Sequence, residues 1–356
     1  MMTKNMFSLF ILMIFVNSNV LALEIEGRRC FVQKTRQAGI CMNVDNCDYA
    51  KDLLKQKPWK RPQHCGEFIG IYPLVCCPRP RSEIVCQTFH PPKEPCIKPE
   101  ISGGEKSLSK EFPHMAALGY GEKSSIMWFC GGSLISEKYI LTAAHCIKTK
   151  NYGMVRWVRL GDLDLATDKD DAQPQEFRVM QTHLHPKYKA PSHYHDIALV
   201  RLDRSARFSD YVQPACLHTE RPVPRDMSVT GWGKAEIAGS PSSHLLKADI
   251  YYVNHTTCAA AHASVKQTRL PNGILNDIQL CAGHPEGRDT CPGDSGGPLQ
   301  YKIYKLSPHF RIVGVTSFGI ACGISKSAVY VRVSEYSEWI EDIVWPAKYF
   351  DPYGGL

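Results

Sequence analysis

The 356-residue sequence lacks several features that mark other classes of protein. Its formal net charge is +7, but no basic stripe with interleaved aromatic residues is present, so a nucleic-acid partner is not expected. None of its cysteines is paired in C-x-x-C spacing, which argues against a zinc site. No repeat of fixed period and no low-complexity tract occurs. What remains is a mildly basic chain whose 44% hydrophobic residues can build a sizeable core.

No apolar run reaches the roughly 20 residues that span a bilayer. The run over Phe7–Val16 follows Lys4 and precedes the small residues of Val20-Leu21-Ala22. This pattern predicts a secretory signal peptide over residues 1–22, with the mature chain beginning at Leu23. The protein is therefore expected to be secreted and extracellular, with no membrane partner.

Cysteine is abundant, and the 15 cysteines of an exported chain are expected to pair, with one left over. After a stub over residues 23–29, a predicted domain over residues 30–77 is too short to bury much core, so disulfides must hold it together. Six cysteines allow 15 pairings, and the residues alone do not select one. The six are Cys30, Cys41, Cys47, Cys65, Cys76 and Cys77.

Residues 78–100 are predicted to form a linker, because their density of proline stiffens a chain and opposes regular structure. Cys86 and Cys96 also lie in this segment, and at least one of them is expected to be bonded elsewhere. The prolines are Pro78, Pro80, Pro91, Pro92, Pro95 and Pro99.

Residues 101–356 are predicted to be mainly β, because short β-branched and aromatic runs alternate with turn residues. A helix is expected near the C-terminus, capped by Ser334, with helically spaced apolar residues, and stopped by Pro346. The predicted strands are Met154–Leu160, Phe177–Thr182, Ile197–Leu202, Met227–Trp232, Phe310–Phe318 and Ala328–Val333.

Three short motifs carry the chemistry. Ser295 lies in GDSGGP, His145 in TAAHC and Asp196 in DIAL. A serine hydroxyl becomes a nucleophile when a histidine takes its proton, and a carboxylate fixes that histidine's tautomer. The glycines around Ser295 let the backbone turn tightly and direct N–H groups at a developing oxyanion.

In this order, at separations of 51 and 99 residues, the motifs resemble those of the chymotrypsin-like serine proteases over residues 101 to about 345. The resemblance implies two six-stranded antiparallel β-barrels with the triad His145, Asp196 and Ser295 in the cleft between them. It also implies an oxyanion hole built from the amides of Gly293 and Ser295, and no required cofactor. The alternative, a catalytically silent cofactor that binds cascade partners, would need a lost triad residue, and none is lost.

The adjacent Cys76-Cys77 that close the six-cysteine segment resemble the clip domain of arthropod cascade proteases. The motifs over Phe112–Ala117 and Tyr194–Leu199 are similar to those of insect members of this family. In that family the clip domain docks partners or regulates activation; an inert spacer is the alternative. The resemblance implies the pairs Cys30–Cys76, Cys41–Cys65 and Cys47–Cys77.

The resemblance also implies that the chain is a zymogen, in which a cut before Ile101 frees an amine that pairs with Asp294. An ammonium partner would relieve the cost of burying the Asp294 charge. Glu100 precedes the cut where most such zymogens carry Arg or Lys. We therefore expect an activating protease of another specificity and negligible self-activation; alternatively, the loop is cut elsewhere and Glu100 has no significance.

Within the protease part the family pattern implies the disulfides Cys130–Cys146, Cys258–Cys281 and Cys291–Cys322, and a bond from Cys216 to the linker. We assign Cys86 as the partner of Cys216, because it stands 15 residues before Ile101 and leaves slack for the activation movement. Cys96 is then the unpaired thiol.

The residue six positions before Ser295 sets specificity in this family, and here it is Asp289. A carboxylate at the base of a closed pocket attracts Arg or Lys and disfavours apolar residues. Ser317, Gly319 and Ala328 are the expected pocket walls. Ala328 stands where a glycine is usual, so its methyl group is predicted to slow turnover. Pro292 is expected to stiffen the oxyanion loop, with an effect on rate that the sequence does not determine.

Two further signals point to ligands or modification. The acidic loop over Asp162–Glu176 resembles a calcium-binding loop of some relatives, so calcium is a candidate ligand there. Asn254 begins an N-glycosylation acceptor motif. His183, His185, His193 and His195 crowd one stretch, but we interpret them as packing or solvated side chains, with no metal.

The sequence therefore predicts a secreted clip-domain endopeptidase of an extracellular cascade, in innate-immune Toll signalling or melanisation. The expected partners are a protein substrate, most simply a downstream zymogen, an upstream activating protease and a serpin-type inhibitor. A digestive protease is the second alternative; the clip domain and Glu100 argue against it.

Overall fold

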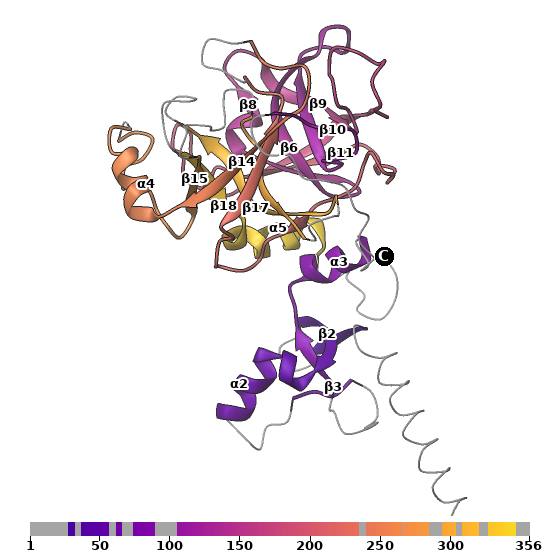
Figure 1. Ribbon diagram of the computed structural model, residues 1–356, viewed down its shortest axis with the longest axis vertical. Helices are drawn as coiled ribbons and strands as arrows, with labels where there is room; N and C mark the ends of the chain where they lie inside the picture. The colour runs from indigo at the N-terminus through magenta and orange to yellow at the C-terminus, as the bar shows by residue number, and fades with distance from the viewer. Residues whose placement is uncertain are drawn as a thin grey trace, which may run out of the picture. The chain divides into compact units, whose positions relative to one another are not determined.

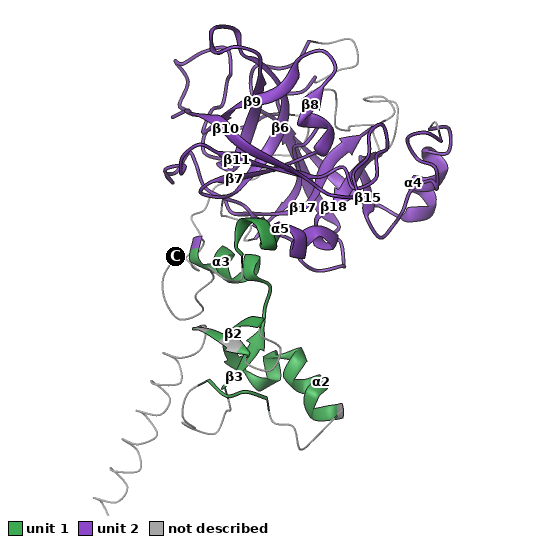
Figure 2. Cartoon of the chain, turned by 180° about the vertical axis from the view of Figure 1, so that it is seen from behind, with its two compact units in different colours: residues 1–88, 341–356 green, residues 89–340 purple. Residues whose placement is uncertain are grey.

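The computed structural model describes residues 28–32, 37–56, 62–65, 74–89, 105–234, 240–265, 267–284, 294–303, 308–319 and 327–346. The chain divides into two compact units, residues 1–88 with 341–356 and residues 89–340 (Figure 2). The predicted signal peptide over residues 1–22 lies outside the described residues. No helix in the described ranges has the length and apolar character needed to cross a membrane.

The first unit contains a small antiparallel sheet of β1 (Arg29–Val32), β2 (Gln37–Asn43) and β3 (Leu74–Pro78), in that order. The 3₁₀ helix η1 (Val44–Asn46) and the helix α2 (Asp48–Gln56) follow β2. The core of this sheet consists largely of cystine. Three disulfides join the elements, with Cα separations within the usual range: Cys30–Cys76, Cys41–Cys65 and Cys47–Cys77.

The linker contains a helix, which corrects the expectation of a segment without regular structure. Helix α3 covers Arg81–Phe89, and β3 extends to Pro78. Pro80 stands just before the helix, where a missing N–H costs nothing, and its carbonyl accepts from the N–H groups of Glu83 and Ile84. No proline follows until Pro91, so the prolines bound the helix and do not interrupt it.

The N-terminus of α3 is capped by a side chain from far along the sequence. Oε1 of Glu341 accepts from the backbone N–H of Ser82 at 3.0 Å and from the Ser82 hydroxyl at 2.5 Å. The Arg81 guanidinium lies 3.5 Å from Oε2 of Glu341 and donates to the carbonyl of Trp345 at 2.9 Å. Since Ser82 and Glu341 are both buried, this carboxylate supplies partners that water cannot.

The second unit begins with a closed β-barrel. β5, β6, β7, β9, β10 and β11 pair in a ring that closes between β9 and β10, and β8 (Lys148–Thr149) joins the edge of β9. Fully buried aliphatic residues such as Leu118, Leu134 and Val158 fill its interior. The six strands are Met115–Tyr120, Met127–Ser136, Tyr139–Thr142, Gly153–Leu160, Gln175–Leu184 and Ala198–Leu202.

A second ring follows in the chain, formed by β13, β14, β15, β16, β17 and β18 and closed between β17 and β18. Figure 1 shows its later strands in orange to yellow and the first barrel in violet to magenta. β12 (Cys216–Leu217) runs parallel to β17, and β4 (Glu105–Lys106) pairs with β14. The six strands are Asp226–Gly231, Leu246–Val253, Gln279–Gly283, Pro298–Lys302, Phe310–Phe318 and Ala328–Arg332. The predicted fold of two six-stranded antiparallel barrels is confirmed.

The remaining elements of the second unit are short. They are η2 (Lys123–Ser125), η3 (Ala144–Cys146) and α4 (His255–Ala261), which lies beside β15 (Figure 1). The predicted C-terminal helix begins later than expected. The 3₁₀ helix η4 (Val333–Tyr336) contains Ser334, and α5 covers Ser337–Val344, with the Ser337 hydroxyl donating to the carbonyl of Ser334 at 3.0 Å. Ser334 is therefore not the helix cap.

Candidate active site

His145 lies in η3, directly after β7 of the first barrel. The neighbouring Cys146 is bonded to Cys130 of β6, which fixes the turn to the barrel wall. The Tyr120 hydroxyl donates to the carbonyl of Cys146 at 2.6 Å from inside the barrel. Two anchors, one covalent and one a hydrogen bond, therefore hold the backbone on which the imidazole is mounted.

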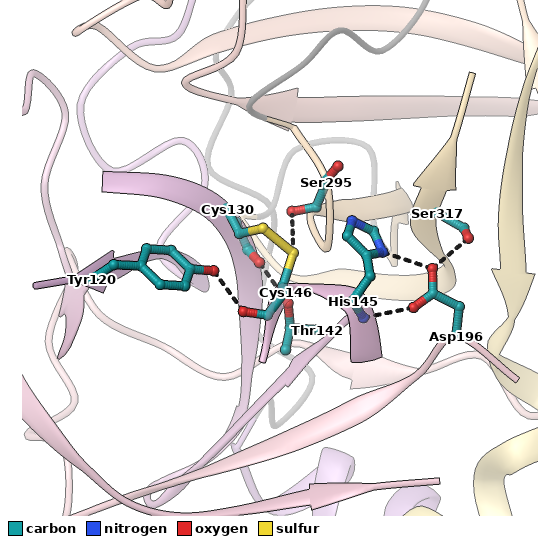
Figure 3. Close-up of a disulfide and its surroundings, with 9 residues drawn as sticks. Tyr120, Cys130, Thr142, His145, Cys146, Asp196, Ser295 and Ser317 are labelled. Carbon is teal, nitrogen blue, oxygen red and sulfur yellow. Dashed lines mark hydrogen bonds and ion pairs between the residues drawn. A yellow bond between two sulfur atoms is a disulfide. The ribbon is translucent and has the colours of Figure 1, made fainter. Parts of the chain in front are cut away.

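Asp196 is fully buried, just before β11 of the same barrel. Its Oδ2 lies 2.8 Å from Nδ1 of His145, and its Oδ1 accepts from the His145 backbone N–H at 2.9 Å. The Ser317 hydroxyl, from β17 of the second barrel, donates to Oδ2 at 2.6 Å (Figure 3). The sequence predicts Ser317 as a pocket wall only, and its bond to Asp196 is an addition from the structure.

The pair is electrostatically coupled. Burial opposes ionisation of Asp196, but the His145 charge and the hydrogen bonds from His145 and Ser317 outweigh it and lower the carboxyl pKa. Burial alone would lower the pKa of His145, yet the Asp196 charge and hydrogen bond raise it above the ordinary 6.5. An ionised carboxylate therefore faces Nδ1, the atom whose proton it stabilises.

Ser295 reaches this pair from the second barrel, in the turn that precedes β16. Its carbonyl accepts from the N–H of Gly131 at 2.9 Å, and the same oxygen lies 3.5 Å from Sγ of Cys146. In Figure 3 the imidazole of His145 lies between Ser295 and Asp196. The turn that carries the serine is thus attached to the strand and disulfide that support the histidine.

Gly296 makes this close approach feasible. Its φ is +80°, a left-handed conformation that residues with a β-carbon rarely adopt. A β-carbon at this position would overlap the Thr142 hydroxyl and lie 2.6 Å from the carbonyl oxygen of Gly131. The Gly296 N–H donates to the carbonyl of Thr316 at 2.9 Å, which ties the turn to β17.

Comparison with known proteins agrees with this geometry. A family model described as Trypsin matches residues 101–340. This chain belongs to the trypsin family. It is 37% identical over 306 residues to serine protease snk of Drosophila melanogaster, across 77% of this chain and 69% of that protein. Among solved structures it is similar to neuropsin, a serine protease expressed in the limbic system of mouse brain, with a TM-score of 0.55 and 32% identity over 68% of this chain and 99% of that one.

Two further relatives match most of this chain, beyond the residues that the family model covers. CLIP domain-containing serine protease B4 of Anopheles gambiae is 35% identical over 356 residues, across 92% of this chain and 94% of that protein. Phenoloxidase-activating factor 1 of Holotrichia diomphalia is 33% identical over 349 residues, across 86% and 91%. The predicted membership of the insect clip-domain serine proteases is confirmed, and the chain is a serine endopeptidase.

Asp294 of this protease is packed against the end of β13. Its Oδ1 accepts from the N–H of Gly233 at 2.9 Å, and β-carbons at Gly231 or Gly233 would collide with its carboxylate. Ile101, whose freed amine is the predicted partner of Asp294, and Glu100 before the cut lie outside the described residues, so the pairing of Ile101 with Asp294 stays a prediction.

Several residues of the predicted pocket and oxyanion hole fall outside the described residues: Asp289, Pro292, Gly293 and the pair Cys291–Cys322. Gly319 is exposed at the end of β17. Ala328 is fully buried at the start of β18, in one cluster with Leu280 and Tyr330. The added methyl group therefore packs in the interior of the second barrel.

One further predicted disulfide of the protease part is present in the structure. Cys258 of α4 is bonded to Cys281 of β15. Cys86 of α3 and Cys216 of β12 are each disulfide-bonded, and their pairing with one another stays a prediction. Cys96 lies outside the described residues.

The carboxylates of the acidic loop Asp162–Glu176 do not converge on one point. Oδ2 of Asp162 lies 3.0 Å from the Arg159 guanidinium, and Asp170 accepts from the backbone N–H of Asp164 at 2.9 Å. Calcium needs several oxygen ligands converging on one point. Within the described ranges, no group of three carboxylate or histidine ligands from this loop converges, and a guanidinium already occupies the buried carboxylate.

Proposed function

We propose that the protein is the secreted zymogen of an endopeptidase that cleaves protein substrates after Arg or Lys in an extracellular cascade. The observation that carries the catalytic part is the buried Asp196 carboxylate, 2.8 Å from Nδ1 of His145 and held by Ser317. In this role His145 is the base, Ser295 the nucleophile and Asp196 the group that orients the base.

Each step then uses a named group. The Ser295 Oγ bonds to the scissile carbonyl carbon while its proton passes to Nε2 of His145. The carbonyl oxygen becomes an oxyanion, which the amides of Gly293 and Ser295 would bind. The C–N bond breaks, and the proton on Nε2 goes to the leaving amine. Water then attacks the acyl ester with His145 again as base, which regenerates the Ser295 hydroxyl.

Substrate choice would come from Asp289, whose carboxylate at the base of the pocket would pair with a guanidinium or ammonium group. Ser317 lies at the end of β17 and Gly319 directly after the strand, on the edge that would run along the substrate. Phe318 between them is stacked against His193, with ring centroids 4.1 Å apart. Burial lowers the pKa of His193 to about 4, so this wall of the groove is uncharged at neutral pH.

The cascade role rests on the domain pairing. A disulfide-held module precedes the protease, and relatives that match most of this chain are named for a CLIP domain and for phenoloxidase activation. A downstream zymogen as substrate, an upstream activator and a serpin-type inhibitor fit this pairing, in melanisation or Toll signalling. Asn254 is exposed, so its acceptor motif is accessible to glycosylation in a secreted chain.

Activation would follow a cut between Glu100 and Ile101. A protease with Asp289 in its pocket selects basic residues, so it would not make this cut on itself. Incubation of the zymogen with trypsin-like and with glutamate-preferring proteases, followed by N-terminal sequencing, tests this. An Ile101 terminus produced by self-incubation alone would refute it.

The decisive experiment is a cleavage profile of the activated enzyme. Residues 96–100 are replaced by an enteropeptidase recognition site, the chain is cut before Ile101, and a peptide library is digested. We expect cleavage after Arg and Lys and covalent labelling of Ser295 by a fluorophosphonate. A chain with an Ile101 terminus that neither hydrolyses peptides nor takes the label would favour the silent cofactor instead.

A further inference from the structure

His195 adopts a backbone conformation that its residue type does not favour. Its φ is +54°, and among the described residues only Lys110 is another non-glycine residue with positive φ. Such a conformation costs about 1–2 kcal/mol and persists where surrounding contacts impose it. His195 directly precedes Asp196, so the strain lies at the residue that sets the direction of the catalytic carboxylate.

The turn around Asp196 is tight. The N–H of Ile197 donates to the carbonyl of His195 at 2.8 Å, which encloses Asp196 between two bonded neighbours. The N–H of His185 donates to the carbonyl of Ile197 at 3.1 Å. Asp196 therefore has little freedom of its own, and its direction follows the φ of His195.

Side chains from the C-terminal segment hold His195 in place. Nδ1 of His195 and the hydroxyl of Tyr336 are hydrogen-bonded at 2.8 Å. The His195 ring stacks on His185 with centroids 5.1 Å apart, and the rings of Tyr336 and Trp339 pack against His185 in T-shaped contacts, with centroids at 4.9 Å and 5.2 Å. Tyr336 is only 3% exposed, so its hydroxyl has little access to water as a substitute partner.

His195 and Tyr336 are both in the protonation state that their hydrogen bond requires. Burial, with the Lys187 charge, lowers the pKa of His195, so its imidazole is neutral at neutral pH. Burial raises the pKa of Tyr336, so its hydroxyl keeps its proton. A neutral imidazole and a protonated hydroxyl form a hydrogen bond without competing charge.

We propose that the His195–Tyr336 hydrogen bond positions Asp196 for catalysis by holding the left-handed turn that aims its carboxylate at His145. His195 and Tyr336 are thus positioning residues, which act through Asp196 and touch no substrate. The inference rests on the proposed catalytic role of Asp196. It adds a dependence of turnover on the segment just before α5, which lies outside the triad motifs.

The test uses the chain cut before Ile101, four single variants and one double variant. Tyr336→Phe removes only the hydroxyl, and His195→Ala removes the imidazole. His195→Asn keeps a side chain that tolerates positive φ and can bond to Tyr336. Lys110→Ala is the matched control, since Lys110 has φ +64° and contacts Asp171 at 3.5 Å, away from the triad.

A misplaced catalytic group of this kind costs up to about 100-fold in rate. We expect Tyr336→Phe and His195→Ala to lower kcat about 10- to 100-fold with KM within twofold, and His195→Asn to recover kcat to within about threefold of the parent. The double variant Tyr336→Phe/His195→Ala should lose no more than the worse single variant. Lys110→Ala should leave kcat unchanged.

These measurements distinguish the positioning role of His195 and Tyr336 from the proposed function itself. If the parent chain cut before Ile101 takes no fluorophosphonate at Ser295, the proposed function fails. If the parent is active but Tyr336→Phe retains its kcat, the positioning role is overturned. The role is also overturned if the loss is confined to KM, or if His195→Asn is as impaired as His195→Ala. Should His195→Ala fail to fold, Tyr336→Phe and His195→Asn still decide the matter.

Discussion

Gly296 and Thr142 are in such close contact that no side chain fits between them: a β-carbon at residue 296 would overlap the Thr142 hydroxyl. Thr142 ends β7, two residues before the 3₁₀ helix that carries His145, and Gly296 follows Ser295. The hydroxyl of Thr142 also donates to the carbonyl of Gly131 at 2.8 Å. The contact between Thr142 and Gly296 therefore sets how closely the Ser295 turn approaches the turn that carries His145.

Gly296→Ala should separate the two groups. Left-handed strain costs about 1–2 kcal/mol, and overpacking adds about 1–3 kcal/mol. We expect loss of fluorophosphonate labelling together with a lower free energy of unfolding in urea. Gly153→Ala is the matched control, because Gly153 has φ +77° but a β-carbon there would have nothing within 4 Å. Equal labelling of the two variants would contradict the argument.

Ser317→Ala should impair catalysis less than loss of the carboxylate itself. A hydrogen bond to a charged group contributes about 1.5–3 kcal/mol, and about 1.4 kcal/mol is tenfold in rate, so kcat should fall by about 10- to 100-fold. Asp196→Asn should cost about 10⁴-fold, because the wrong tautomer of His145 is then favoured. Hydrolysis of an arginine amide measures both. Ser136→Ala, another buried serine, is the control and should keep its rate; a Ser317→Ala enzyme with parental kcat would sink the prediction.

The pH dependence follows from the two shifted pKa values. His145 must be neutral to accept a proton, and its pKa is raised, so kcat/KM should rise with pH through a midpoint above 6.5. The same pairing also affects the free energy of unfolding. Because the pKa of His145 is raised, its pairing stabilises the fold fully below about pH 6.5, and this stabilisation is lost as the pH rises through the folded pKa. Because the pKa of Asp196 is lowered, its pairing stabilises the fold above about pH 3.9, and this stabilisation is lost as the pH falls through the folded pKa. A kcat/KM midpoint below 6.5 would count against the coupling.

Glu341→Ala should loosen α3. The variant leaves the N–H and hydroxyl of buried Ser82 without this acceptor and removes one of the partners of Arg81, which keeps Asp342 and the carbonyl of Trp345. Hydrogen bonds to a charged group contribute about 1.5–3 kcal/mol each. We expect faster amide hydrogen exchange across Arg81–Phe89, measured by mass spectrometry. Glu338→Ala, at an exposed position of the same C-terminal helix, should leave this exchange unchanged.

Ala328→Gly tests the effect of the methyl group on turnover. The sequence predicts that turnover on arginine and lysine peptides rises, because the glycine would remove a methyl group from the wall that β18 is expected to give the pocket. Stability should fall by about 0.5–1 kcal/mol, since a glycine replaces alanine in the interior of the barrel. Parallel kinetics and urea unfolding provide the two readouts. Unchanged kinetics together with reduced stability would show that Ala328 serves the core alone.

The motifs TAAHC, DIAL and GDSGGP predict the triad residues, and the family resemblance that these motifs carry implies both barrels. Contacts between distant segments are not predictable in this way. The bond from Ser317 to Asp196 joins residues 121 positions apart, and the residue types alone do not indicate it. The left-handed φ of His195 has no sequence signal either, since it depends on Tyr336, 141 positions away.

The two errors in secondary structure have local causes. The proline content near α3 predicts a uniformly stiff segment, but Pro80 and Pro91 flank a helical stretch and do not break it. Serine favours the cap position of a helix, which predicts Ser334 as the cap, yet Ser334 lies inside η4 and the α-helix starts at Ser337. Proline content thus hides a helix in the first case, and in the second case the serine places the start of the helix only approximately.

The division of the triad between two barrels has a consequence for how this enzyme can fail. His145 and Asp196 belong to the first ring of strands, and Ser295 with Ser317 belongs to the second. Peptide hydrolysis thus depends on the seam, the interface between the two barrels. Each barrel can stay folded while a shift at this interface separates the triad residues. Inherited or engineered changes along the seam therefore threaten the chemistry before they threaten the architecture.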